Sequence, residues 1–218
     1  MSKKFLVFLV MGAFLVVSCK NDTKKAEDAQ EVTEVSADAN VYVADIAASV
    51  IEWEGSKPTG KHNGTIKIKS GELSLNNGKI EGGKFVIDMT SIEVLDLQGK
   101  EKTDLEGHLK GLAKDESADH FFNTTKYPEA SFEITSVVTE NGVTTVSGNL
   151  TMKEITKNVS FPATILVNEG QLTLSTETFS INRTDWKVNY GSKSIFADLG
   201  DKFINDNIDL KITLSTTK

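Results

Sequence analysis

Apolar and polar residues alternate with a period of two in short runs from Val41 to the end of the chain. The clearest runs lie at 65–69, 72–75, 131–135, 171–175 and 207–214. A period of two puts apolar side chains on one face of a strand and polar side chains on the other. The pattern therefore predicts an all-β fold whose strands each have one buried and one wet face.

Turn signals separate these runs, and the strongest are Asn76-Asn77-Gly78, Asn141-Gly142 and Glu169-Gly170. Asn-Gly between two alternating runs is the strongest short signal for a β-hairpin. Strands joined by such turns form an antiparallel, meandering sheet. About eight strands of this kind can close into a barrel whose interior is either filled by side chains or open to one small ligand. An outer-membrane barrel is not favoured, because it turns its apolar face to lipid.

A helical insertion is predicted between residues 96 and 127. Leu105, Leu109 and Leu112 recur at spacings of four and three, which suits a short amphipathic helix. A second helical turn is expected at 119–122, and Tyr127-Pro128 then returns the chain to an extended conformation.

The first residues resemble the signal peptide of a bacterial lipoprotein. Lys3 and Lys4 precede thirteen uncharged residues, 5–17, a length that is too short to span a bilayer. The stretch ends in Val16-Val17-Ser18-Cys19, which is similar to a lipobox. The resemblance implies removal of residues 1–18 and acylation of Cys19 with diacylglyceryl and palmitate-type chains. It places the protein at the periplasmic face of the cell envelope, and Lys20 favours the outer membrane over the inner.

Residues 19–40 carry the expected lipidated cysteine and an acidic spacer. Between positions 20 and 40 there are six Asp and Glu, three Lys and no aromatic residue. Such a segment buries too little apolar surface to offset its ordering entropy, so we expect a flexible tether, with a short amphipathic helix as the alternative. The folded domain is then predicted to span 41–218.

Composition excludes several functional classes. With 24 Lys and Arg against 31 Asp and Glu, the chain has no excess positive charge for nucleic acid. One cysteine cannot form an internal disulfide or a multi-thiolate zinc site. The three histidines, His62, His108 and His120, lack metal-ligand spacing, and no catalytic motif is present. We therefore expect no catalytic residues, no metal and no cofactor, and the sequence specifies no oligomeric state.

Arg183 is the only arginine of the chain. A single arginine among many lysines indicates a position that needs a planar, bidentate donor. Asp185 and Asp45 are the expected partners. A buried structural ion pair between Arg183 and Asp185 is favoured over contact with a ligand headgroup.

Several segments, in the same order, resemble the YceI-like family of periplasmic lipid-binding proteins. They are 45–53, 60–64, 82–89, 105–110 with 119–122, Tyr127-Pro128-Glu129-Ala130-Ser131-Phe132-Glu133, 146–153 and 179–186. Glu154 stands where the family usually has glycine, and His62 lies later than the family's histidine, so no role is assigned to His62.

The resemblance implies an extended, lipocalin-like antiparallel barrel around a long apolar cavity that holds a polyisoprenoid, an isoprenoid quinone or a fatty acid. Large apolar residues at inward positions are then the expected cavity lining: Trp53, Phe85, Phe121, Phe122, Phe132, Ile134, Phe161 and Phe179. Alternatively, each of these residues is part of an ordinary packed core. Phe121 and Phe122 can also serve to pack the helical insertion against the barrel.

Two functional hypotheses follow from these observations. The first is a non-enzymatic carrier that binds, moves or sequesters an amphiphilic lipid while Cys19 anchors it to a membrane. The second is a structural or interaction lipoprotein with a fully packed barrel and no ligand. An enzyme acting on lipid is the least favoured, because the histidines are the only polar candidates identified for catalysis in the interior.

Overall fold

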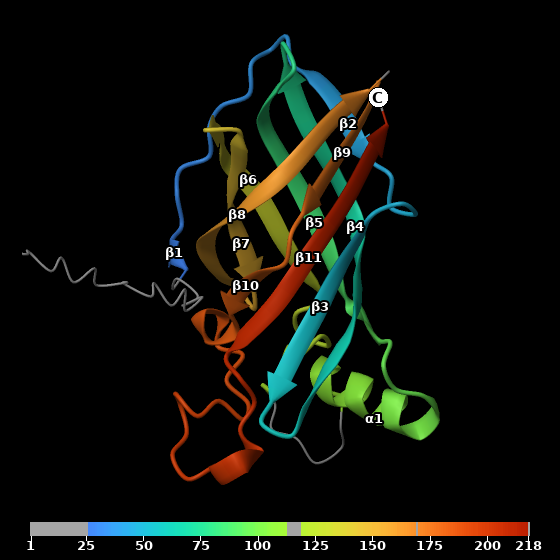
Figure 1. The fold of residues 1–218 in the computed structure, drawn as a ribbon, viewed down its shortest axis with the longest axis vertical. Helices are drawn as coiled ribbons and strands as arrows, with labels where there is room; N and C mark the ends of the chain where they lie inside the picture. Colours follow the sequence, from blue (N-terminus) through green and yellow to red (C-terminus); the bar gives the residue numbers. More distant parts are fainter. Residues whose placement is uncertain (1–25, 113–118, 169, 218) are drawn as a thin grey trace, which may run out of the picture.

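The computed structural model describes residues 26–112, 119–168 and 170–217, which form one antiparallel barrel with a helix at one end (Figure 1). The strands are β1 (Glu27–Asp28), β2 (Asn40–Ala44), β3 (Val50–Lys57), β4 (Gly60–Asn76), β5 (Lys79–Val94), β6 (Glu129–Glu140), β7 (Val143–Met152), β8 (Ile155–Asn168), β9 (Gln171–Thr176), β10 (Phe179–Asn182) and β11 (Asn207–Thr217). The helix is α1 (Gly99–Lys110), and two short 3-10 turns are η1 (Arg183–Trp186) and η2 (Gly200–Lys202).

Eight strands form the closed ring of the barrel. Strands β4 to β9 pair in chain order, β9 pairs with β11, and β3 closes the ring between β11 and β4. Strand β2 also pairs with β4 and β11 and so continues the position of β3 toward the other end. The predicted all-β barrel of about eight antiparallel strands is therefore confirmed.

The inward face of the ring is apolar, as the alternating pattern predicts. In β5 the side chains of Phe85, Ile87 and Met89 are buried, and in β7 Val146 and Leu150 are buried on the same alternation. Closure of the sheet leaves the polar positions of each strand on the outside. The core is thus a single layer of side chains that line the barrel.

Tight turns join the strands at the end of the barrel farthest from α1. Asn77 and Gly78 have φ values of 50° and 76°, and Asn141 and Gly142 have 51° and 80°. Positive φ at both central residues is the geometry that Asn-Gly favours in two-residue hairpins. The two Asn-Gly hairpins predicted from the sequence are confirmed.

A third two-residue turn connects β7 to β8 without any glycine. Lys153 and Glu154 have φ values of 48° and 62°. A side chain in this left-handed region costs roughly 1–2 kcal/mol compared with glycine. Glu154 therefore adopts the left-handed conformation that glycine favours, and the turn contains local strain.

Replacing Glu154 with glycine should relieve this strain and stabilise the protein. We expect Glu154→Gly to raise the free energy of unfolding by about 0.5–1 kcal/mol, because the lost strain exceeds the added flexibility of the unfolded chain. Urea denaturation measures the change. As a control, Glu140→Gly in extended β6 should lower the same quantity, and a loss with Glu154→Gly would contradict the strain at this turn.

The helical insertion packs against the end of the barrel opposite the Asn-Gly hairpins (Figure 1). Helix α1 ends at Gly111, whose φ of 72° is the left-handed cap that glycine favours. The expected apolar face is present at Leu105 and Leu109, whereas Leu112 follows the helix and is exposed. The predicted second helical turn at 119–122 is wrong, because this segment forms hydrogen-bonded turns.

The segment 26–40, named the strap below, differs from the expected flexible tether. Its first part, β1, pairs with β8, and Ser36 near its other end donates two hydrogen bonds to the carboxylate of Glu81. The prediction of a free spacer, and of an amphipathic helix as its alternative, is therefore wrong for the described part of 19–40. Pairing with the outer face of the barrel supplies hydrogen-bond partners that the acidic composition does not reveal.

The predicted signal peptide and Cys19 lie outside the described residues. In the part of the chain that the structure describes, no helix has the length and apolar character needed to cross a bilayer.

Candidate functional site

Two adjacent cavities occupy the interior of the barrel. The larger, named the mouth cavity, has a volume of about 240 Å³, and the smaller, named the inner cavity, about 90 Å³. They share five wall residues, Ile51, Ile87, Leu150, Ile181 and Leu210. Protein interiors rarely leave voids larger than a water molecule, which needs about 10–15 Å³ on this measure. The interior of this barrel is therefore open, and the fully packed alternative does not describe it.

The two cavities differ in polarity along the barrel. Every residue that lines the inner cavity is apolar. Polar residues of the mouth cavity come from the β3–β4 hairpin, α1, η1 and the segment before β11, and they include Ser56, Lys57, His62, Arg183 and Asn205. The walls thus change from mostly apolar with several polar residues at the α1 end to wholly apolar at depth.

All eight predicted lining residues lie on the walls of these cavities. Trp53, Phe121 and Phe122 line the mouth cavity, and Phe85, Phe132, Ile134, Phe161 and Phe179 line the inner cavity. The rings of Phe161 and Phe179 stack with their centroids 4.5 Å apart. Contact of these residues with a ligand stays a prediction.

Glycines on neighbouring strands hold several of these rings flat against the wall. The pairs are Gly64 with Trp53, Gly71 with Phe85 and Gly148 with Phe132. A Cβ atom on Gly71 would lie 2.1 Å from Cδ1 of Phe85, so no other residue fits beneath that ring. Aromatic rings that cover strand glycines occupy the wall rather than the lumen. The pairing of glycine with an aromatic residue across two strands is the signal that sequence reasoning missed.

An aromatic cluster lies at the mouth of the larger cavity. The ring of Tyr190 is 4.8 Å from that of His108, 4.2 Å from that of His120 and 5.2 Å from that of Phe121, centroid to centroid. His120 Nε2 lies 3.1 Å from His108 Nδ1, within hydrogen-bond distance. Through their contacts with Tyr190, the two histidines of the insertion pack against the segment that follows η1. Within the described ranges, no group of three residues could hold a metal ion.

Lys153 of the β7–β8 turn contacts the segment that carries Phe121. Its Nζ donates to the carbonyl oxygen of Phe121 at 3.0 Å and lies 2.8 Å from Oδ1 of Asp119, and its side chain is 4% exposed. Burial works to raise the pKa of Asp119, but the hydrogen bond and charge of Lys153 outweigh it and keep that pKa below its usual value. Phe121 has a φ of 43°, a conformation that a bulky residue keeps only when its surroundings hold it.

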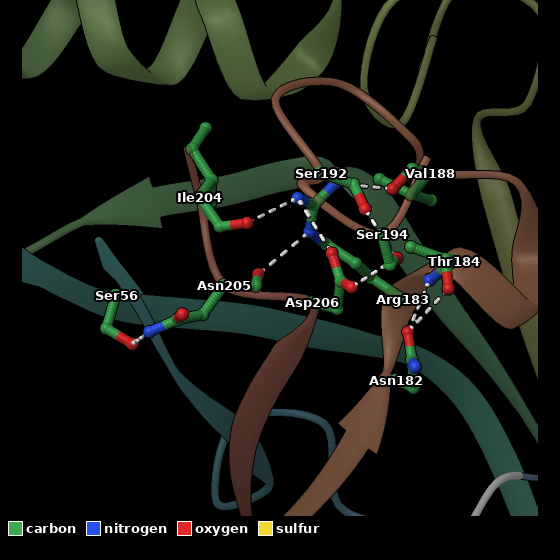
Figure 2. A network of polar contacts seen from close by, with 10 residues as sticks. All are labelled: Ser56, Asn182, Arg183, Thr184, Val188, Ser192, Ser194, Ile204, Asn205 and Asp206. Atoms are coloured by element: carbon green, nitrogen blue, oxygen red, sulfur yellow. Dashed lines mark hydrogen bonds and ion pairs between the residues drawn. The ribbon is translucent and has the colours of Figure 1, made fainter. Parts of the chain in front are cut away.

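Arg183 is buried at the base of the segment 189–205, named the rim loop below. Its guanidinium donates to the carbonyl oxygens of Val188, Ile204 and Asn205, which flank or end the loop (Figure 2). Burial lowers the pKa of Arg183, and the charge of Asp206 opposes that effect. A planar fork of donors reaches three carbonyl groups at once, which explains why arginine occupies this position.

The predicted ion pair between Arg183 and Asp185 is wrong. The carboxylate nearest to the guanidinium belongs to Asp206, whose Oδ1 lies 3.8 Å from Nη2. Asp185 instead accepts a hydrogen bond from the backbone N–H of Ala26 in the strap, and Asp45 accepts from the N–H groups of Ala47 and Ala48. Asp206 comes close because the rim loop turns back to Arg183, which sequence proximity does not show.

Comparison with known proteins places this barrel in a family. The sequence profile of the YceI-like domain matches residues 42–216. The chain belongs to the YceI-like family. The match covers all of the ring strands and the insertion, and the resemblance predicted from the sequence motifs is confirmed.

Two solved structures show the same fold. One is Burkholderia cenocepacia BcnA, 21% identical, with a TM-score of 0.62 over 80% of this chain and 99% of that one. The other is a polyisoprenoid binding domain from Saccharophagus degradans implicated in plant cell wall breakdown, 15% identical, with a TM-score of 0.56 over 81% of this chain and 97% of that one. A comparison with curated proteins gives no match.

Proposed function

We propose that this protein is a non-enzymatic carrier that binds one long-chain amphiphile, with the chain in the inner cavity and the polar head at the mouth. The observation that carries the proposal is that polar side chains line the cavities only at the α1 end, whereas the walls at depth are wholly apolar. A ligand that matches this gradient has one polar end and one long apolar part. Binding gains about 0.8 kcal/mol for each methylene that it buries.

A polyisoprenoid, an isoprenoid quinone or a fatty acid has this shape. Membership of the YceI-like family supports the isoprenoid class, as does the fold shared with the polyisoprenoid binding domain from Saccharophagus degradans.

The walls favour binding over catalysis. The titratable residues that line the described cavities are Lys57, His62, His108 and Arg183, and all four line the mouth cavity. Arg183 is engaged by three carbonyl oxygens, and His62 Nδ1 lies 2.8 Å from Asp96 Oδ2. These groups suit contact with a polar head, and the deep apolar walls offer no acid or base to a ligand chain.

Membrane attachment through Cys19 is the second part of the proposal. The lipobox-like Val16-Val17-Ser18-Cys19 supports it, and acylation there would keep the carrier at the periplasmic face of the cell envelope, at the outer membrane. A lipid anchor places the carrier in contact with a large reservoir of its ligand.

Native mass spectrometry tests the carrier. The chain from residue 19 with Cys19→Ser is purified without detergent, and bound molecules are extracted and weighed. We expect one long-chain amphiphile per protein, and its mass identifies the ligand class. An empty protein that also refuses added isoprenoid quinones and fatty acids would overturn the carrier and favour an interaction module.

A further inference from the structure

The hairpin of β3 and β4 turns one of its faces toward the mouth cavity. Side chains at directly opposite positions of an antiparallel pair share a face, and so do positions two apart along a strand. Trp53 and Lys57 of β3 and His62 of β4 all line the mouth cavity. The opposite pairs that make up this inner face are Trp53 with Gly64, Gly55 with His62, and Lys57 with Gly60.

Two glycines leave a hollow on this inner face. Gly55 and Gly60 both line the mouth cavity, and a Cβ atom at either would have no atom of a non-adjacent residue within 4 Å. Gly64 differs, because the ring of Trp53 covers it. Glycine inside a strand often marks a place where a ligand approaches the backbone closely. The hollow over Gly55 therefore lies between the side chains of Trp53 and Lys57.

The spacing of the strand suits one polar head in this hollow. Residues of a strand advance by about 3.3 Å, so Trp53 and Lys57 each lie roughly 7 Å from Gly55 along β3. His62, directly opposite, is roughly 5 Å away. A group bound over Gly55 is thus within reach of all three side chains.

The titratable residues of the mouth cavity are all basic. They are Lys57, His62, His108 and Arg183, and no Asp or Glu lines either of the two cavities, although the chain has 31 acidic against 24 basic residues. Arg183 is engaged by carbonyl oxygens, and His62 lies against Asp96. Within the described residues, the ammonium group of Lys57 has no carboxylate or carbonyl partner.

A second lysine of the same hairpin shows the contrast. Lys61 lies opposite Ser56 on the outer face, and its Nζ is 2.9 Å from Oε2 of Glu54. The lysine of the outer face is therefore neutralised by the protein itself, whereas Lys57 is not. A cation without a partner at the edge of a cavity attracts an anionic group.

The end of β3 that carries Lys57 is held in place. The backbone N–H of Asn205 donates to the carbonyl oxygen of Ser56 at 2.9 Å, and Nδ2 of Asn205 donates to Oγ of Ser56 at 2.8 Å (Figure 2). This backbone is ordered without a ligand, so binding at Lys57 costs little further ordering of the strand.

Trp53 supplies a free donor on the other side of the hollow. Its side chain is buried, and its Nε1 has no hydrogen-bond partner. Buried polar groups nearly always have a partner, so this indole N–H needs an explanation. An oxygen atom of a ligand in the mouth cavity would be the missing acceptor.

We propose that the hollow over Gly55 selects amphiphiles with an anionic head, a carboxylate or a phosphate, and that Lys57 gives this preference. Oxygen atoms of the head accept from Lys57 Nζ and Trp53 Nε1, and the chain extends toward the inner cavity. A hydrogen bond between an ammonium group and an anionic oxygen is about twice as strong as a neutral one. The neutral head of an isoprenoid quinone lacks that bond. This inference rests on the proposed function and deepens it, because it names the class of head.

Three amphiphiles with the same chain length test the preference. Dodecanoate, dodecyl phosphate and dodecan-1-ol are titrated at neutral pH into the Cys19→Ser chain loaded with N-phenyl-1-naphthylamine, a neutral fluorescent probe that they displace. We expect both anions to bind roughly five- to tenfold more tightly than the alcohol. The tighter of the two anions identifies the head as a carboxylate or a phosphate.

Matched variants of the hairpin assign the preference to Lys57. Lys57 is exposed, so Lys57→Gln should fold normally, weaken both anions to the affinity of the alcohol, and leave the alcohol unchanged. Lys61→Gln removes the same charge from the outer face and should keep the preference. Gly55→Leu fills the hollow and should remove the preference.

Three results would overturn the proposed head selection. They are equal affinity of the wild type for all three amphiphiles, a preference that survives Lys57→Gln, and a preference lost equally in Lys61→Gln. In each case the amphiphiles still bind, so the carrier itself stands. A wild type that binds none of the three, and is empty in native mass spectrometry, would overturn the carrier as well.

Discussion

Leu150→Trp is expected to weaken binding of long chains strongly while short amphiphiles still bind. Leu150 is buried in β7 and lines both cavities, so a larger ring there fills the boundary between them and keeps a ligand chain out of the inner cavity. A chain that loses the burial of three methylenes loses about 2.4 kcal/mol, which is roughly a 50-fold weaker affinity. A ligand short enough for the mouth cavity loses much less.

Fluorescence titration with fatty acids of increasing length measures this effect. Wild-type affinity should increase with chain length, and the Leu150→Trp affinity should stop increasing once the chain fills the mouth cavity. Leu166→Trp on the outer side of β8, where Leu166 is 63% exposed, is the matched control and should follow the wild type. The same length dependence in Leu150→Trp and in the wild type would show that ligands do not pass from the mouth cavity into the inner cavity.

Arg183→Lys is expected to lower the free energy of unfolding by roughly 2–5 kcal/mol, because each buried carbonyl left without a donor costs about 1–3 kcal/mol. A lysine ammonium reaches fewer than the three carbonyl oxygens that Arg183 joins, and Arg183 is 1% exposed. Urea denaturation measures the loss. Lys211→Ala removes a surface ion pair and is the control, with an expected change below about 1 kcal/mol.

The same variant should open the rim loop. Trypsin cleaves after lysine, and Lys193 and Lys202 lie in the loop that Arg183 closes. Cleavage there should be much faster in Arg183→Lys than in Lys211→Ala under native conditions. Loop cleavage at the wild-type rate would show that the loop closes without the arginine fork, even if global stability falls.

The sequence by itself determines the barrel and most of its lining. Period-two alternation in β11 and Asn-Gly at 141–142 specify strands and hairpins because both depend on neighbouring residues. Inward alternation likewise places Trp53, Phe85 and Phe132 on the inner face. Closure of the strands into a ring is not encoded by these local patterns, and it was the resemblance to the family motifs that implied it.

The tertiary structure alone decides three features that matter for function. The cavity is open because rings such as Phe85 lie flat on glycines of adjacent strands, which requires the register of strand pairing. Arg183 faces Asp206 rather than Asp185 because the rim loop, residues 189–205, leads the chain back to Arg183. The strap docks although its composition is that of a spacer, because its partners Asp185, Asn149 and Glu81 are brought together only by folding. Each feature is a contact between residues far apart in the chain, and such contacts leave no periodic signal in the sequence.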